Sequence, residues 1–179
     1  VCMLLRLRDR EIDCTHQTRI MAILNVSDDS PFAFSRVGVS QALTRAQELA
    51  RHGAAIIDVG AHSTATGARD LTAQEEIDRV CPVIEAVTRG GLIVSVDTWT
   101  PAVARAAAEA GAHLLNDVTG FSDPEMVRVA ADFGLPGCVM HMRGEPRTMQ
   151  DDPQYRDVVE EVIAFLNARI AAIVAAGVR

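Results

Sequence analysis

The sequence predicts an α/β fold built around a parallel sheet. Strand-like and helix-like segments alternate along the chain, and this succession recurs five times. The strand-like runs are apolar almost throughout, which is typical of strands whose two faces are both covered. Short turns such as "HGA", "AGA" and "FGL" lead from a helix back into a strand. Strand–helix units in such a series form either a barrel or a doubly wound sheet.

The elements follow from apolar runs and from the spacing of apolar residues between them. Residues 1–18 form a candidate hairpin, with "LLRLR" and "EIDC" on either side of a polar turn. The expected strands of the sheet are Ile20–Val26, Ala55–Val59, Leu92–Val96, His113–Asn116 and Gly137–His141. The expected helices are Ser40–Arg51, Ala73–Thr88, Pro101–Glu109, Pro124–Asp132 and Gln154–Ala175.

Three of the helices carry start signals. Thr72 is a candidate N-cap, and Glu75 three residues later completes a capping box. Thr100 and Asp123 are candidate N-caps of the next two helices, each followed by a proline at the first helical position. These signals support the helical assignment of the segments between the strands.

Composition excludes several classes of protein. An apolar fraction of 49% among 179 residues is enough for a sizeable core. The net charge of −7, without a basic run, argues against a nucleic-acid-binding protein. No apolar run approaches the roughly 20 residues that span a bilayer, and no signal-peptide pattern is visible. We therefore expect a cytoplasmic protein that binds neither nucleic acid nor membrane.

The four cysteines do not indicate a disulfide framework or a zinc site. Cys2, Cys14, Cys81 and Cys138 are scattered along the chain and form no CxxC pair. Free thiols are the expectation for such a pattern.

Polar residues follow every strand of the expected sheet. A single aspartate in such a position is usually a turn former or a helix cap. Five strands that all end in polar residues indicate a ligand, because ligands of parallel α/β folds lie at the carboxyl ends of the strands. The residues concerned are Asn25, Asp58, Asp97, Asn116 with Asp117, and His141 with Arg143.

The polar set lacks the signatures of several common mechanisms. The sequence has no GxSxG nucleophile elbow, no GxxxxGK[ST] phosphate loop and no GxGxxG dinucleotide fingerprint. A serine hydrolase, a P-loop nucleotidase and a Rossmann dehydrogenase are therefore not expected.

Five motifs resemble, in order, the strand-end motifs of the dihydropteroate synthase family. They are "IMAILNVSDDS", "GAAIIDVGAHST", "IVSVDTWTPAVARAA", "GAHLLNDVTGF" and "CVMHMRGEPRTMQ". The resemblance implies a TIM (β/α)8-type barrel that binds a pterin pyrophosphate and joins the pterin to p-aminobenzoate. It covers residues from about 19 onward, so we expect an N-terminal extension at 1–18 and a barrel domain at 19–179.

The resemblance also implies roles for individual residues. Asn25 would ligate Mg²⁺ near the pyrophosphate, and Thr64 would lie beside the pyrophosphate and the aminobenzoate. Asp97 and Asn116 would bind the pterin ring, with Asp58 supporting the site from below. The expected catalytic residues are thus Asn25, Thr64 and Asp97. The expected substrate-binding residues are Asp58, Ser63, Thr64, Asp97, Asn116, His141 and Arg143.

The sequence departs from the family pattern in two loops and in the number of β/α units that it covers. The loop at 27–38 has altered glycines, and in the loop at 61–67 Ala65 replaces an arginine whose bidentate grip alanine does not offer. A complete barrel has eight strands in about 250 residues. We therefore expect about five β/α units here and a barrel that is incomplete at its C-terminal side.

Three functions remain open at this stage. The first is a dihydropteroate synthase-type transferase of folate biosynthesis, with a homodimer as a candidate assembly. The second is a non-catalytic pterin-binding or regulatory homologue that lacks the pyrophosphate loop. The third is a methyltetrahydrofolate-dependent methyltransferase, which the segment "GEPRTMQ" disfavours because it resembles the synthases.

Overall fold

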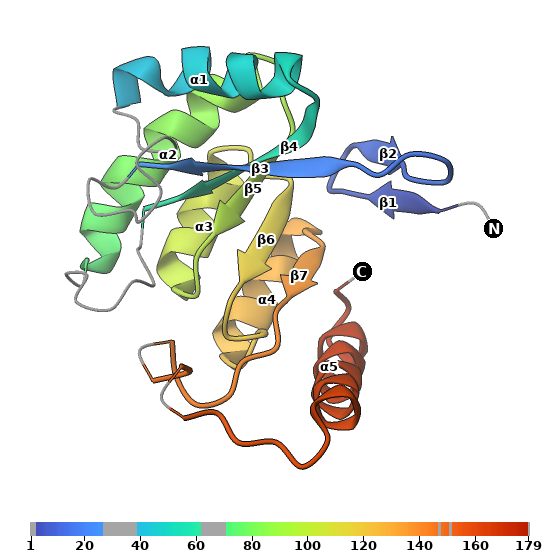
Figure 1. The fold of residues 1–179 in the computed structure, drawn as a ribbon. Coiled ribbons are helices and arrows are strands. Elements are labelled where there is room, and N and C mark those ends of the chain that lie inside the picture. Colours follow the sequence, from blue (N-terminus) through green and yellow to red (C-terminus); the bar gives the residue numbers. More distant parts are fainter. Residues whose placement is uncertain (1–2, 27–38, 62–70, 147, 151, 179) are drawn as a thin grey trace.

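The computed structural model describes residues 3–26, 39–61, 71–146, 148–150 and 152–178 (Figure 1). The strands are β1 (Leu4–Arg6), β2 (Glu11–Asp13), β3 (Ile20–Asn25), β4 (Ala54–Gly60), β5 (Val94–Asp97), β6 (Leu114–Asp117) and β7 (Gly137–Val139). The helices are α1 (Val39–Arg51), α2 (Ala73–Arg89), α3 (Pro101–Glu109), α4 (Pro124–Phe133) and α5 (Val158–Ala175). Each predicted strand and helix is therefore present, with bounds that differ by a few residues.

The sheet is parallel and singly wound. Its strand order is β3-β4-β5-β6-β7, so each strand lies beside the next one along the chain. A doubly wound sheet reverses its order at a switch point, and this sheet does not. Figure 1 shows α1 to α4 following one another around the outside of the curved sheet. This is the winding of a barrel, which the alternating elements alone did not distinguish from the other arrangement.

The main core lies between the sheet and these outer helices. Val80, Val83, Ile84 and Val87 occupy one face of α2 at helical spacing, and all four are fully buried. Every second residue of the strands packs in the same core, among them Ile57 and Val59 of β4 and Val94 and Val96 of β5. Because side chains alternate across a strand, the intervening residues project from the inner face of the sheet.

The helix caps agree with the sequence in two of three cases. Thr72 accepts a hydrogen bond from the Glu75 backbone N–H, and the Glu75 carboxylate accepts one from the Thr72 N–H. Asp123 caps α4 through the Glu125 N–H. Thr100 makes no side-chain cap. The Thr98 hydroxyl instead accepts from the Thr100 N–H at 3.2 Å, so the turn before α3 is held from the preceding strand end.

Helix α5 begins later than predicted. The sequence predicted a start at Gln154, but the helix begins at Val158. Asp157 determines this start, because its carboxylate accepts hydrogen bonds from the N–H groups of Val159 and Glu160 at 3.0 Å each. The predicted helix was too long because the prediction relied on the spacing of apolar residues and did not recognise Asp157 as the N-cap.

The β1–β2 hairpin packs against the amino-terminal end of the sheet. Its strands are antiparallel, and its turn reaches the end of α3. The Arg8 guanidinium donates to the carbonyl oxygens of Ala108 at 2.7 Å and Ala112 at 3.4 Å. A cation near the carboxyl end of a helix also interacts favourably with the helix dipole. The division of the chain into an extension and a barrel domain stays a prediction.

Replacing Arg8 with alanine is expected to lower the free energy of unfolding by about 1–2 kcal/mol, since a charged hydrogen bond at a partly exposed helix end is lost. Urea unfolding measures the change. Arg6→Ala is the matched control. Arg6 forms an exposed ion pair with Glu11, and its loss is expected to cost at most about 0.5 kcal/mol. Equal effects of the two changes would contradict the role given to Arg8.

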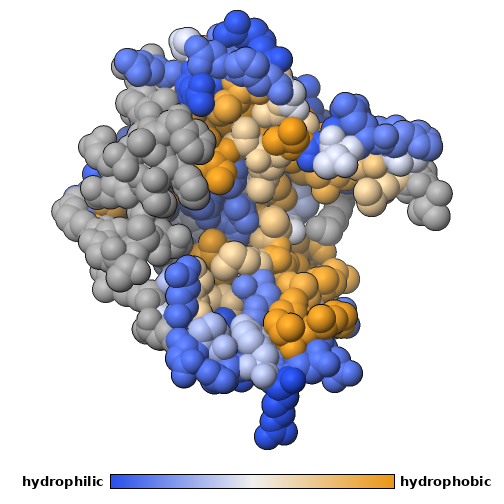
Figure 2. Space-filling model, in the orientation of Figure 1, coloured by the Kyte–Doolittle hydropathy of each residue, from blue (hydrophilic) through white to orange (hydrophobic). Residues whose placement is uncertain are grey.

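Apolar side chains remain exposed on the inner side of the sheet and on α5. In the described part of the chain β3 pairs only with β4 and β7 only with β6, so both edges of the sheet are open. Ile20 and Ile23 of β3 are about half exposed, as are Val159, Ile163 and Val174 of α5. Figure 2 shows apolar surface at both places. No helix among the described residues is long and apolar enough to span a bilayer.

Candidate functional site

One row of residues crosses the whole sheet near the carboxyl ends of its strands. The pairing of neighbouring strands brings Asn25, Gly60, Asp97, Asn116 and Cys138 into register, one from each strand. Residues in register on parallel strands project to the same face. The row therefore places two amides, one carboxylate and one thiol on the inner face, with a glycine among them.

The next row toward the amino ends contains the buried polar layer of the sheet. Asp58 of β4 is in register with Ile23 on one side and Ser95 on the other. Asp58 is 5% exposed, and its Oδ2 accepts a hydrogen bond of 3.0 Å from Asn116 Nδ2. This bond joins the two rows, so Asp58 supports Asn116 from below.

Burial controls the ionisation of Asp58. It raises the pKa of the Asp58 carboxyl, and the side chains of Ser95 and Asn116 oppose this shift. Among the described residues, neither Asp58 Oδ1 nor Ser95 Oγ has a partner in hydrogen-bond geometry, although both atoms are fully enclosed. Unsatisfied buried polar atoms are uncommon in folded proteins and concentrate at functional sites.

Gly60 leaves room for the Asp97 side chain. A Cβ atom at position 60 would lie 3.2 Å from Asp97 Cβ and 3.4 Å from Asp97 Oδ2. These distances are shorter than ordinary contacts between such atoms, so the carboxylate of Asp97 would have to move by a few tenths of an ångström. A glycine here permits the close approach of a functional side chain.

Gly60→Ala is expected to weaken binding of any ligand that Asp97 contacts by about 3- to 10-fold, because the displaced carboxylate loses hydrogen-bond geometry. The measurement is calorimetric titration with a pterin. In an Asp97→Gly background the same change is expected to have no further effect, since both the Cβ and the carboxylate that the added methyl group would meet are then absent. A loss of equal size in both backgrounds would show that Gly60 acts by another route.

Asp117 does not belong to the row, although it follows Asn116 directly. It is fully buried on the other side of the strand, and the hydrogen bonds of its carboxylate to described residues lie within its own loop. Oδ1 accepts from the Thr119 N–H and hydroxyl at 2.8 Å each, and Oδ2 accepts from the Phe121 N–H at 2.9 Å. Burial raises the pKa of the Asp117 carboxyl, while these bonds and Arg169 oppose the shift. Of the two polar residues at the end of β6, Asn116 therefore faces the inner side of the sheet, and Asp117 stabilises the turn that follows the strand.

His141 and Arg143 lie beyond β7 and contact α5 and the segment before it. The His141 ring packs edge-on against Phe165, with ring centroids 4.9 Å apart. Arg143 pairs with Glu161 at 2.9 Å, binds the Gln154 carbonyl and lies over the Tyr155 ring. Both side chains therefore contact α5 and the segment before it. Their expected contact with substrate stays a prediction.

The remaining expected site residues lie outside the described residues. Ser63 and Thr64 fall at 62–70, together with the altered positions His62 and Ala65. The first loop, with its aspartates, falls at 27–38. Their roles stay predictions from the sequence.

Three members of the site were missed by the sequence analysis: Gly60, Cys138 and Ser95. Cys138 is the member of the row on β7. For this strand the sequence analysis had predicted His141 and Arg143 as the site residues. Burial raises the pKa of the Cys138 thiol, and the negative charges of Asp58 and Asp97 add to the shift, so Cys138 is a neutral group facing the same interior. Counting residues along neighbouring strands would have found all three, once the register was known.

A metal ion at this site would have to be shared with a ligand. Among the described residues, no three His, Cys, Asp or Glu side chains come together as a metal site. Asn25 contributes one amide oxygen at the end of β3. Such an oxygen suits Mg²⁺ when phosphate oxygens and waters complete the coordination, so the residues fit a cation that arrives with a phosphorylated ligand.

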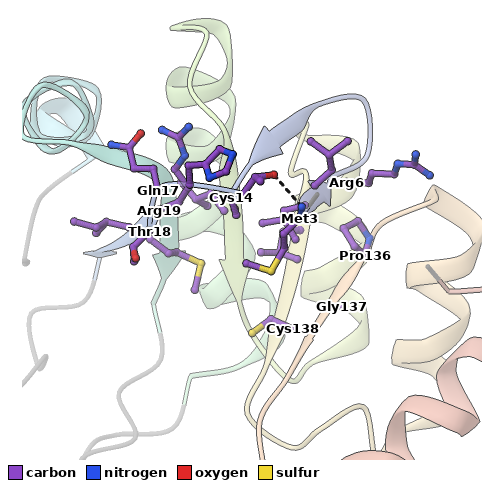
Figure 3. A pocket seen from close by; sticks show the side chains of 17 residues that line it. Met3, Arg6, Cys14, Gln17, Thr18, Arg19, Pro136, Gly137 and Cys138 are labelled. Atoms are coloured by element: carbon purple, nitrogen blue, oxygen red, sulfur yellow. Dashed lines mark hydrogen bonds between the residues drawn. The ribbon is translucent and has the colours of Figure 1, made fainter. Parts of the chain in front are cut away.

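A large cavity lies at the other end of the sheet. It measures about 1370 Å³, opens to solvent, and lies between the hairpin and the amino-terminal ends of the strands (Figure 3). Its walls are mostly apolar and include Met3, Ile56 and Leu114. Ligands of parallel α/β folds bind at the carboxyl ends, and the polar row lies there. We therefore assign the candidate site to the row and not to this cavity.

Curated relatives and solved structures resemble this chain over nearly its whole length. The chain is 43% identical over 172 residues to a dihydropteroate synthase of Escherichia coli, which covers 93% of this chain and 60% of that protein. It is 41% identical over 166 residues to a dihydropteroate synthase of Haemophilus influenzae, covering 90% and 59%. The chain thus spans about 60% of the length of these relatives.

The structural comparisons agree with this. The Yersinia pestis dihydropteroate synthase in complex with a sulfonamide drug superposes with a TM-score of 0.92 at 41% identity, covering 99% of this chain and 65% of that one. The Thermus thermophilus enzyme in complex with 4-aminobenzoate gives 0.86 at 45% identity, covering 98% and 63%. The five β/α units are therefore part of a TIM-type barrel, as expected from the sequence.

The family profile described as pterin binding enzyme matches residues 21–179, which include every residue of the row. With the winding of the sheet and the similarity to the synthases, this shows that the chain belongs to the family of pterin-binding enzymes.

Proposed function

We propose that the protein is a dihydropteroate synthase, which condenses a pterin pyrophosphate with p-aminobenzoate and releases pyrophosphate. The observation that carries the proposal is the row at the carboxyl ends, where Asp97 and Asn116 lie in register above the buried Asp58. Solved relatives that bind 4-aminobenzoate and 6HMPPP support it. The proposal extends to the whole protein and thus goes beyond the described β/α units.

The residue types in the row suit a pterin ring. The edge of such a ring alternates hydrogen-bond donors and acceptors. A carboxylate accepts only, whereas an amide both donates and accepts, so Asp97 and Asn116 together can match an alternating edge. The buried surroundings strengthen these bonds, because the local dielectric constant is lower than in water.

The chemical step breaks the bond between the pterin methylene carbon and a pyrophosphate oxygen. The amine nitrogen of p-aminobenzoate forms the new bond to that carbon and loses a proton. Stabilising the negative charge of the departing pyrophosphate is then the main task of the protein. Mg²⁺ held by Asn25 and phosphate oxygens would neutralise part of this charge. Asp97 and Asn116 hold the ring so that the methylene carbon faces the amine.

Synthesis of dihydropteroate is the direct test. The full-length protein is incubated with 7,8-dihydropterin pyrophosphate, p-aminobenzoate and Mg²⁺, and both products are measured. We expect equal amounts of dihydropteroate and pyrophosphate, and at least a 10-fold loss of rate with Asp97→Ala or with EDTA. Binding of the pterin without turnover would favour the non-catalytic pterin-binding homologue that the altered loop at 61–67 suggests.

We also propose a cytoplasmic location, which the composition of the chain suggests, and a homodimeric assembly. Gel filtration with light scattering measures the assembly. A mass of two chains is the expected result, and a single-chain mass would contradict it.

A further inference from the structure

We propose that His113 is an acid-sensitive latch that holds the β1–β2 hairpin against the amino-terminal ends of β5 and β6. The histidine directly precedes β6, and only 3% of it is exposed. It contacts β5 through its backbone N–H and one ring nitrogen. It contacts the hairpin turn through its carbonyl oxygen and the other ring nitrogen. One residue thus joins the sheet to the hairpin.

The neutral ring of His113 takes part in the pairing of β5 with β6. Its Nδ1 atom lies 3.2 Å from the backbone nitrogen of Val94. A backbone N–H can only donate, so Nδ1 is the acceptor and the ring proton is on Nε2. The His113 backbone N–H donates in turn to the Val94 carbonyl oxygen at 2.8 Å. Both polar groups of the Val94 backbone are therefore satisfied by this one residue.

The hairpin turn contacts the same histidine. The Arg8 backbone N–H donates to the His113 carbonyl oxygen at 3.3 Å. His113 Nε2 lies 3.6 Å from Asp9 Oδ1, which suits a charged pair but exceeds the length of an ordinary hydrogen bond. The Arg8 guanidinium and a small apolar cluster hold the hairpin as well, and the cluster consists of Leu7, Ile12, Ile56 and Leu114.

Protonation of the ring disrupts this arrangement. An imidazolium carries a proton on each nitrogen, so its Nδ1–H would face the Val94 N–H, donor against donor. The ring also lies in an almost enclosed site, where a charge is costly unless it is paired. Asp9 offers such a pair toward solvent, because 67% of its side chain is exposed. A protonated ring is therefore expected to leave Val94 and turn toward Asp9.

The charges of the hairpin turn adjust the pH at which the latch opens. Burial lowers the pKa of the His113 imidazole. The Asp9 carboxylate opposes this shift, whereas the guanidinium groups of Arg10 and Arg8 add to it. The stability that the neutral ring contributes is fully present above the ordinary histidine pKa of 6.5, and it is lost as the pH falls through the folded pKa. Acid therefore opens the latch.

Opening of the latch is expected to be local. The hairpin lies beside the cavity at this end of the sheet, and Leu4, Leu5 and Leu114 are among the residues that line it (Figure 3). The main core is a separate cluster on the other face of the sheet. Acid is therefore expected to expose apolar side chains around the cavity while the outer helices stay packed.

Hydrogen exchange followed by mass spectrometry tests the proposal on the full-length protein. The protection of peptides from residues 3–14 is measured between pH 7.5 and 4.5 and corrected for the intrinsic rate of exchange. We expect these peptides to lose protection by at least about 10-fold toward acid, while peptides from α2 in the main core change little. Hairpin protection that stays the same across this range would overturn the proposal.

His113→Asn removes the titration and keeps an acceptor. The new amide oxygen can take the place of Nδ1 opposite the Val94 N–H, and an amide binds no proton in this range. The hairpin of this variant is expected to keep its protection at every pH. His52→Asn is the matched control, because His52 is exposed after α1 and its replacement is expected to leave the acid response of the parent intact. An unaltered acid response in His113→Asn would overturn the proposal.

Two changes in the exposed turn keep the test decisive if His113→Asn does not fold. Asp9→Asn removes the charge that favours the protonated ring, so the midpoint of the exchange transition is expected to move to lower pH. Arg10→Ala removes a charge that disfavours it, so the midpoint is expected to move to higher pH. A purely structural role of the turn would lower protection at every pH without moving the midpoint. Midpoints that stay in place, or that move in the same direction, would overturn the proposal.

Discussion

Replacing Asp117 with alanine is expected to lower the free energy of unfolding by about 2–5 kcal/mol. The change removes three hydrogen bonds at once and leaves the backbone N–H groups of Thr119 and Phe121 without their acceptor. Each buried donor that loses its partner costs about 1–3 kcal/mol. The bonds also hold Phe121 in the left-handed region, at φ 58°, which a non-glycine residue adopts only when its surroundings enforce it.

The loop after β6 connects this effect to α5. Arg169 of α5 donates to the Gly120 carbonyl at 2.9 Å and to the Phe121 carbonyl, so the turn that Asp117 closes also anchors the helix. Urea unfolding measures the change in stability. Asp123→Ala is the matched control, because it removes an exposed N-cap and is expected to cost about 1 kcal/mol. A loss no larger than that of the control would contradict the structural role of Asp117.

Asp97→Ala and Asn116→Ala are each expected to weaken pterin binding by about 1–3 kcal/mol, the cost of removing one partner of a buried hydrogen bond. This corresponds to roughly 5- to 150-fold in affinity. Both residues lie in register at the ends of neighbouring strands, so one ring can contact both. Calorimetry with a pterin ligand measures the two losses.

The control for this pair is Ser122→Ala. Ser122 is exposed in the loop between β6 and α4, so its replacement is expected to leave pterin affinity unchanged. Unchanged affinity in both site variants would mean that the pterin binds elsewhere or not at all.

The fold was largely predictable because its signals are local. Apolar runs bounded by glycine turns identify the strands, and Thr72 with Glu75 and Asp123 identify two helix starts. The start of α5 was wrong because the apolar pattern of the segment continued past the Asp157 cap. The choice between a barrel and a doubly wound sheet needed strand pairing or the family resemblance, since both windings share the same succession of elements.

The sequence predicted most of the polar residues of the candidate site, but it did not predict how they are arranged. Asn25, Asp97 and Asn116 stand out because each follows an apolar strand, and the structure places them in one row. Gly60 and Cys138 carry no such signal, since a glycine and a cysteine in an apolar run are ordinary core residues. Asp117 gives the same signal as Asn116 but lies on the opposite face, and only the alternation along β6 distinguishes the two.

A crystal structure of the full-length protein with bound pterin pyrophosphate tests the central claim most directly, namely that the row at the carboxyl ends of the strands holds the pterin. We expect the ring within hydrogen-bond distance of Asp97 and Asn116, with Asp58 beneath Asn116 and out of contact with the ligand. A ring bound instead in the apolar cavity under the hairpin, or away from both side chains, would contradict this assignment of the site.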